Sequence, residues 1–111
     1  MWQAYDGGST RGGRGSEEGR IVVDEEYEGS VRITLEEGCR AAPLAITCGL
    51  YGWLVHTRFF SDEGEAQRAF ADMKGALVEL IRLATVGDGD NEAEVVRRTS
   101  EAVSQFVERY P

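Results

Sequence analysis

The longest uncharged stretch of the chain covers residues 41–57 and is its most apolar part. A membrane-spanning helix needs about 20 consecutive apolar residues, so this stretch is too short. It is also interrupted by Pro43, Gly49 and Gly52, and it is rich in the β-branched and aromatic residues that favour strands. The stretch therefore predicts a β-hairpin in the centre of a folded core.

Alternation along this hairpin predicts which side chains share a face. A turn near Leu50 and Tyr51 would pair Cys48 with Trp53 and Ile46 with Val55. The resulting apolar face would consist of Leu44, Ile46, Cys48, Trp53, Val55, Thr57 and Phe59. Under this pairing, the opposite and outward face carries His56 and Arg58.

Residues 20–37 alternate with a period of two and predict two further strands. A three-residue turn at 28–30 pairs Tyr27 with Val31, and it keeps the apolar residues of both strands on one face. A two-residue turn would mix apolar and charged faces, so the apolar pattern selects the longer turn. The same register places Val23 opposite Leu35, with Ile21 on the same face as Val23.

After Phe60 the apolar residues recur at helical spacing. Ser61 is predicted to cap a first helix, and Asp90 or Asn91 a second helix that ends near Arg109. The predicted apolar stripe of the second helix is Val96, Thr99, Val103, Phe106 and Tyr110. Strands followed by helices indicate an α+β fold, here a four-stranded antiparallel meander with two C-terminal helices packed on one face.

The chain has 111 residues, the size of one domain. Residues 1–19 are rich in glycine and poor in apolar residues, which predicts a flexible N-terminal arm before a single α+β domain at 20–111. The start of the chain has no apolar segment typical of a signal peptide, and we expect a cytoplasmic protein with reduced thiols.

The formal net charge is −8 and the pI is about 4.6. Such a charge repels phosphate backbones and anionic lipids, so neither nucleic acid nor membrane is an expected partner. Cys39 and Cys48 do not form a CxxC pair and have no neighbouring ligands at metal-binding spacing. We expect no metal and no cofactor, an inert buried Cys48, and an incidental loop cysteine at Cys39.

The segment 88–92, DGDNE, resembles the start of a calcium-binding loop. Counted from Asp88, however, the glycine and glutamate that such a loop requires at positions 6 and 12 are Ala93 and Thr99. The segment therefore predicts a turn and a helix cap.

The outward sheet face is the candidate ligand site. We expect His56 and Arg58 there beside Arg32, Glu26 and Glu36, a combination that could hold an anion or supply a general base. A solvated network of cross-strand charges is the favoured alternative. Catalysis also needs a pocket and a second positioned group, so no catalytic residue is predicted.

Two apolar helical stripes compete for one apolar sheet face. We therefore expect Phe106, Val107 and Tyr110 to remain partly exposed and to form an interface. The expected function is a non-enzymatic protein-interaction module, a homodimer joined by the C-terminal helix or by a free sheet edge. An anionic-ligand binder or enzyme that uses the polar face is the second hypothesis, and a single-stranded nucleic-acid binder is the third.

Overall fold

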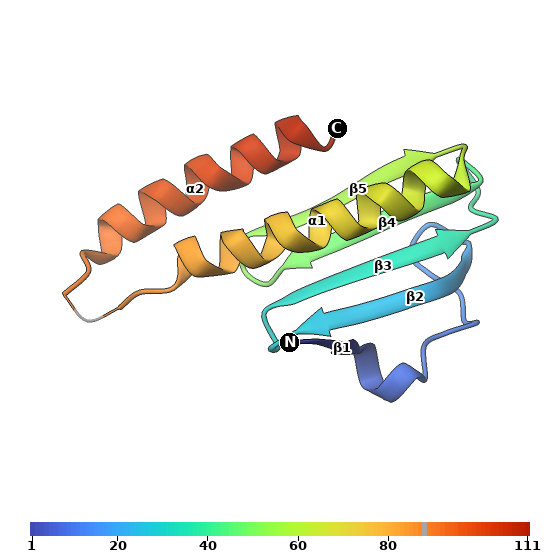
Figure 1. The fold of residues 1–111 in the computed structure, drawn as a ribbon, viewed down its shortest axis with the longest axis horizontal. Coiled ribbons are helices and arrows are strands. Elements are labelled where there is room, and N and C mark those ends of the chain that lie inside the picture. The colour runs from blue at the N-terminus through green and yellow to red at the C-terminus, as the bar shows by residue number, and fades with distance from the viewer. Residues whose placement is uncertain (88) are drawn as a thin grey trace.

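The computed structural model describes residues 1–87 and 89–111. Its elements, in chain order, are β1 (Trp2–Ala4), a 3-10 turn (Tyr5–Gly8), β2 (Arg20–Tyr27), β3 (Val31–Glu37), β4 (Leu44–Leu50), β5 (Leu54–Phe60), α1 (Glu63–Ala84) and α2 (Glu92–Arg109). The strands form one antiparallel sheet in the order β1-β2-β3-β4-β5 (Figure 1). The predicted α+β fold is confirmed, with one short strand added. Asp88, where the comparison with a calcium loop began, lies outside the described residues.

Both helices lie on the same side of the sheet, α1 over β3 and β4 and α2 beside α1 (Figure 1). The far end of the helical hairpin extends past the ends of the strands, and the molecule measures 47 × 30 × 20 Å. Within the described part of the chain, neither helix is long and apolar enough to cross a membrane.

The helices begin at side-chain caps. The Asp62 carboxylate accepts a hydrogen bond from the backbone N–H of Glu65 at 2.8 Å, so α1 is capped one residue later than the predicted Ser61. The Asn91 side chain accepts from the N–H of Glu94 at 3.2 Å, which confirms one of the two predicted caps of α2.

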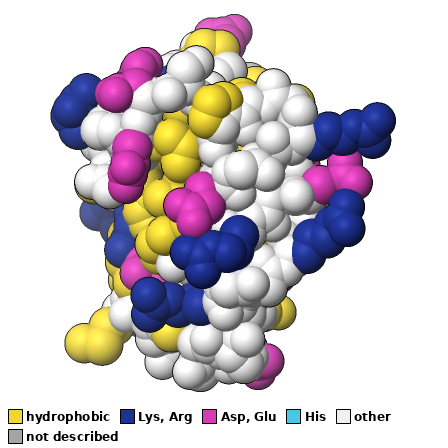
Figure 2. Space-filling model, turned by 90° about the vertical axis from the view of Figure 1, so that its right-hand side faces the viewer, with side chains coloured by type: hydrophobic (Ala, Val, Ile, Leu, Met, Phe, Trp, Pro, Cys, Tyr) yellow, Lys and Arg dark blue, Asp and Glu magenta, His cyan; other side chains and the backbone are white. Residues whose placement is uncertain are grey.

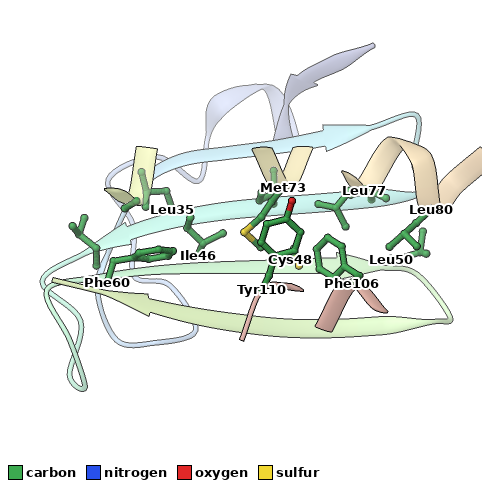
Figure 3. Close-up of a cluster of buried hydrophobic side chains, with 14 residues drawn as sticks. Leu35, Ile46, Cys48, Leu50, Phe60, Met73, Leu77, Leu80, Phe106 and Tyr110 are labelled. Atoms are coloured by element: carbon green, nitrogen blue, oxygen red, sulfur yellow. The ribbon is translucent and has the colours of Figure 1, made fainter. Parts of the chain in front are cut away.

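The core lies between the sheet and the helices, and its side chains come from β3, β4, the end of β5, α1 and the C-terminal end of α2 (Figure 3). Phe106 and Tyr110 are both only 4% exposed and belong to this core, so the prediction that they form an exposed interface is wrong. Val107 is half-buried. The predicted stripe of α2 is confirmed at Thr99, Val103, Phe106 and Tyr110. It differs at its start, where Val95 is buried and Val96 is 50% exposed.

The register of β2 and β3 matches the prediction at Tyr27 with Val31 and at Val23 with Leu35. The pairing then shifts between Ile21 and Val23, and Ile21 lies opposite Glu36. A bulged residue interrupts the alternation of faces, so Ile21 lies on the outward face instead of the predicted helix-facing one.

The register of β4 and β5 differs from the prediction. Cys48 lies opposite His56, not Trp53, and Ile46 lies opposite Arg58, not Val55. The turn is a three-residue one, 51–53, closed by a hydrogen bond from the Trp53 N–H to the Leu50 carbonyl at 2.8 Å. The observed register of β5 is displaced by three residues from the predicted one, with His56 in place of Trp53 opposite Cys48. Because three is an odd number, every side chain of β5 changes face.

This inversion exchanges the predicted environments along β5. Val55 is 81% exposed and Phe59 is 48% exposed on the outward face, whereas His56 and Arg58 lie on the helix side. Gly52 explains the turn, because its φ of +84° is a conformation that favours glycine. The placement of His56 and Arg58 on the polar outward face is therefore wrong.

Residues 1–19 pack against the sheet and do not project from it as an arm. β1 pairs with β2, with Trp2 opposite Tyr27. The Gly12 N–H donates to the carbonyl of Ile21, and the Ile21 N–H donates to the carbonyl of Gly13, each at 2.8 Å. The N-terminal segment thus covers the edge of β2, so the described sheet ends in the three-residue β1 on one side and in the seven-residue β5 on the other.

Lys74 on α1 holds the N-terminal strand from the helix side. Its ammonium group forms an ion pair with Glu25 and lies 5.0 Å from the centre of the Trp2 ring and 5.7 Å from that of Phe70. The half-buried ammonium group is attracted both by the carboxylate and by the faces of the two aromatic rings, and these attractions stabilise the packing of β1 and β2 against α1. The only lysine of the chain is therefore part of the fold.

Candidate functional site

The outward face of the sheet has a polar half and an apolar half. Its side chains form three rows across β2 to β5. The rows are Ile21, Glu36, Ala45 and Phe59; Asp24, Thr34, Thr47 and Thr57; and Glu26, Arg32, Gly49 and Val55. The charges lie on β2 and β3, whereas β4 and β5 contribute small, hydroxyl and apolar side chains.

Asp24 is the centre of the polar half. It is buried, and its carboxylate accepts hydrogen bonds from Arg32 Nε at 2.9 Å and Nη2 at 2.6 Å, from Thr34 at 3.1 Å and from Thr10 at 2.9 Å. Burial alone raises the pKa of Asp24, but the hydrogen bonds and charge of Arg32 with the two threonine bonds outweigh it, and the pKa is lowered. Arg32 also stacks over the ring of Tyr5, 3.7 Å from its centre.

Glu36 is completely buried and anchors the N-terminal loop. Its carboxylate accepts hydrogen bonds from the backbone N–H groups of Glu17 and Gly19, both at 3.1 Å. Gly15 lies directly over this carboxylate, because a Cβ added there would be 2.1 Å from the Glu36 Cδ. Glu36 is thus satisfied internally, and a glycine at 15 is required for the loop to close over it.

A groove of about 680 Å³ lies on this face. Residues 14–16 line it from the N-terminal loop, and the turn 51–53 lines it from the β4–β5 hairpin. Thr34, Thr47 and Gly49 contribute from the strands between them. Cavities of roughly 300–1,000 Å³ are typical of small-molecule sites, so the groove has the right size for one.

Two arginines supply the basic groups of the groove. Arg32 uses Nε and Nη2 for Asp24, and Nη1 has no hydrogen-bond partner within residues 1–87 and 89–111. The Arg14 side chain is 72% exposed and is paired with Glu18 at 2.6 Å. Tyr51 donates to Glu26 at 2.8 Å, and burial together with this carboxylate raises the pKa of Tyr51 to about 12.

The structure divides the predicted ligand-binding set. Arg32 and Glu36 line the groove, and Glu26 lies opposite Arg32 in the strand register. His56 and Arg58 lie on the other face of the sheet. The predicted cluster of all five residues is therefore not assembled.

His56 and Arg58 instead hold the end of α2. His56 Nε2 is hydrogen-bonded to the carbonyl of Tyr110, and Arg58 Nε donates to the carbonyl of Pro111 at 3.2 Å. The Arg58 guanidinium also lies 4.8 Å from the centre of the Phe60 ring. These contacts satisfy carbonyls at the C-terminal end of the helix and place Phe106 against the His56 ring.

A second, smaller hollow lies between α1 and β2. It encloses about 250 Å³ and is lined by apolar side chains including Val22, Val23 and Phe70. Figure 2 views the end of the molecule at which α1 begins, and it shows a band of apolar atoms with acidic and basic side chains beside it. The acidic residues Glu37 and Glu63 lie at its border, and its volume is below the usual range of small-molecule sites.

Neither cysteine has the environment of a nucleophile. Burial raises the pKa of Cys48 to about 12, and burial with the charges of Glu36 and Glu17 raises the pKa of Cys39. The thiolate is the reactive form, so a raised pKa lowers reactivity. Among the residues that the structure describes, no group of three or more His, Cys, Asp or Glu side chains could hold a metal ion.

Sequence reasoning missed Arg14, Gly49 and Tyr51 as groove residues. A glycine-rich segment with few apolar residues predicts an arm, but glycines also mark places where the backbone approaches another side chain closely. Gly49, within an apolar strand, also indicates such a place, because a glycine in a strand leaves space on the face of the sheet.

Comparisons of the chain with protein-family models, with curated proteins and with solved structures gave no match.

Replacing Asp24 with asparagine should lower the free energy of unfolding at pH 7 by about 2–3 kcal/mol, because Arg32 loses its charged partner. The pKa of Asp24 is lowered on folding, so its contribution is present above the pKa of an unfolded aspartate, about 3.9, and is lost as the pH falls through the folded value. Urea unfolding at pH 7 and pH 3 should show the difference between wild type and variant shrinking in acid.

Glu94→Gln is the matched control, because Glu94 also has a lowered pKa but forms an exposed ion pair with Arg97. It should change the stability far less than Asp24→Asn does. Equal effects of the two substitutions would contradict the structural role of Asp24.

Gly15→Ala should destabilise the protein by about 2 kcal/mol, because the new Cβ displaces the loop that satisfies Glu36. Gly75→Ala on α1 is the control: nothing lies within 4 Å of the added Cβ, and alanine in a helix is favoured by up to about 1 kcal/mol. Denaturant unfolding should therefore shift in opposite directions for the two variants. A stabilising Gly15→Ala would mean that the loop does not pack on Glu36.

Proposed function

We propose that this protein is a non-enzymatic interaction module that forms a homodimer through the open edge of β5. The observation that carries the proposal is the exposure of apolar side chains on an edge strand. Val55 is 81% exposed and Phe59 is 48% exposed on the outward face of β5. Large apolar side chains on an unprotected edge are typical of association sites.

The two edge strands of the described sheet differ in length, since β1 has three residues and β5 has seven. The edge of β2 is covered by β1 and by hydrogen bonds with Gly12 and Gly13. β5 is the last strand of the described sheet and has no strand on its outer side. An open edge offers unpaired backbone groups to another chain, and a second copy can complete them by antiparallel pairing.

The distribution of charge favours β5 as the contact between two copies. Each copy has a formal net charge of −8, so two copies repel one another over most of their surfaces. Between Glu37 and Asp62 the sequence contains no aspartate and no glutamate. This segment includes all of β4 and β5, and approach through β5 is therefore the least opposed.

The sequence of β5 is self-complementary when it pairs with itself. Antiparallel pairing centred on Thr57 places Val55 of each copy opposite Phe59 of the other, and Thr57 opposite Thr57. Directly opposed apolar or aromatic pairs contribute roughly 0.2–1 kcal/mol each. The twofold axis of the dimer, at Thr57, would generate the Val55–Phe59 pair twice. The sheets of the two copies would then form one continuous sheet.

A contact through α2 has less support. The expected anchors of such an interface, Phe106 and Tyr110, are already buried within the chain. Val96 remains half exposed on α2 and offers a direct comparison with Val55.

A cytoplasmic location fits this proposal. Cys39 and Cys48 are both free thiols, and free thiols persist in a reducing compartment.

Size-exclusion chromatography with light scattering should give the mass of a dimer, and Val55→Lys should shift the protein to a monomer. The substituted side chain is exposed, so the free energy of unfolding of the monomer should change by no more than about 0.5 kcal/mol. Two lysines introduced beside the dyad would repel one another and oppose pairing of the edges.

Val96→Lys is the matched control, since it makes the same change at an exposed valine on α2. It should leave the dimer intact. A monomeric wild type at high concentration would refute the homodimer. If Val96→Lys abolishes the dimer and Val55→Lys preserves it, the interface lies on α2 and not on β5.

A further inference from the structure

We infer that the outward groove binds an amphipathic organic anion, a small molecule with an apolar or aromatic body and one anionic group. This goes beyond self-association and does not depend on it. The groove has the volume of a small-molecule site, about 680 Å³, and it combines hydrogen-bond donors with exposed apolar side chains.

The available polar groups of the groove are mainly donors. Arg32 Nη1 has no partner within the described part of the chain, and the guanidinium is held in place by Asp24 and by the ring of Tyr5. Among the described residues, the Arg14 side chain has an exposed ion pair with Glu18 as its one charged contact, which is weak and can exchange for another anion. A ligand that satisfies these groups must bring acceptors, and guanidinium groups prefer anionic ones.

The carboxylates near the groove are already occupied. Glu36 lines it but is completely buried and bonded to two backbone N–H groups. Asp24 is buried under Arg32, and Glu18 and Glu26 are bonded to Arg14 and Tyr51. Of these four residues, only Glu36 lines the groove. The charged groups on the surface of the groove are therefore two arginines and one buried carboxylate.

The apolar part of the groove lies beside these arginines. Ile21, Trp53 and Val55 line it together with the half-exposed Tyr51. Gly49 lies between Arg32 and Val55 in its row and leaves space on the face of the sheet where a side chain would otherwise stand. An apolar body over Gly49 would contact Val55 while its anionic group reaches Arg32.

The dye 8-anilinonaphthalene-1-sulfonate has this chemistry and serves as the probe. Fluorescence titration should show saturable binding of one dye per chain. N-phenyl-1-naphthylamine, which has the same aromatic body without the sulfonate, should bind at least about tenfold more weakly, because it cannot engage the arginines.

Gly49→Val should abolish binding of the dye by filling the groove. The added Cβ would meet only the Leu54 carbonyl, at an ordinary 3.6 Å, and valine is favoured in strands, so the fold should be kept. Unchanged mass by light scattering and unchanged circular dichroism would show that neither dimerisation nor folding accounts for the loss. A variant that binds the dye as the wild type does would overturn the proposal.

Arg14→Gln should weaken binding of the dye by about two- to fivefold through loss of one exposed charge contact. Arg40→Gln is its matched control, because Arg40 also pairs with Glu18 but does not line the groove. It should leave the affinity unchanged. Equal weakening by both variants, or equal binding of the neutral analogue, would contradict recognition of an anion in the groove.

Discussion

The pairing of β4 with β5 is the constraint on which the rest of the molecule depends. It places Cys48 opposite His56, so that alternate residues of β5 from Leu54 to Phe60 face the helices. His56 and Arg58 then hold the carbonyls at the end of α2, and this contact brings Phe106 into the core. The same pairing leaves apolar side chains of β5 on the outward face, and both the proposed dimer edge and the apolar side of the groove follow from it.

The second constraint is a pair of buried carboxylates on the outward face. The sheet gives Arg32 and Thr34 to Asp24, but the further donor of Asp24 and the donors of Glu36 lie outside it, and a buried charge without partners is strongly destabilising. The N-terminal segment provides them through Thr10, Glu17 and Gly19. A glycine-rich sequence is suited to this role because its backbone can approach a buried side chain closely, as the contact of Gly15 with Glu36 demonstrates.

The fold class, the β2–β3 register from Val23 to Val31 and the ends of α2 could be predicted from the sequence, because each depends on local alternation, turn length or capping. The register of β5 could not be predicted, because both faces of the strand carry apolar side chains. Leu54 and Phe60 lie on one face, and Val55 and Phe59 lie on the other. Either pairing would bring apolar side chains of β5 to the core, and the observed pairing has Gly52 in its turn at a φ of +84°. Of the candidate site, alternation predicts the β3 residues Arg32 and Glu36, whereas the loop and turn residues Arg14 and Tyr51 reach the groove through long-range packing.

Cross-strand nuclear Overhauser effects in the β4–β5 hairpin test this account most directly. The structure places Thr47 opposite Thr57, with their hydroxyl groups 3.1 Å apart, so contacts between their backbone protons are expected. Contacts that instead pair Thr57 with Leu44 and Trp53 with Cys48 would return Val55 and Phe59 to the core. That result would contradict the orientation of β5, and the dimer edge and the groove would both lose their basis.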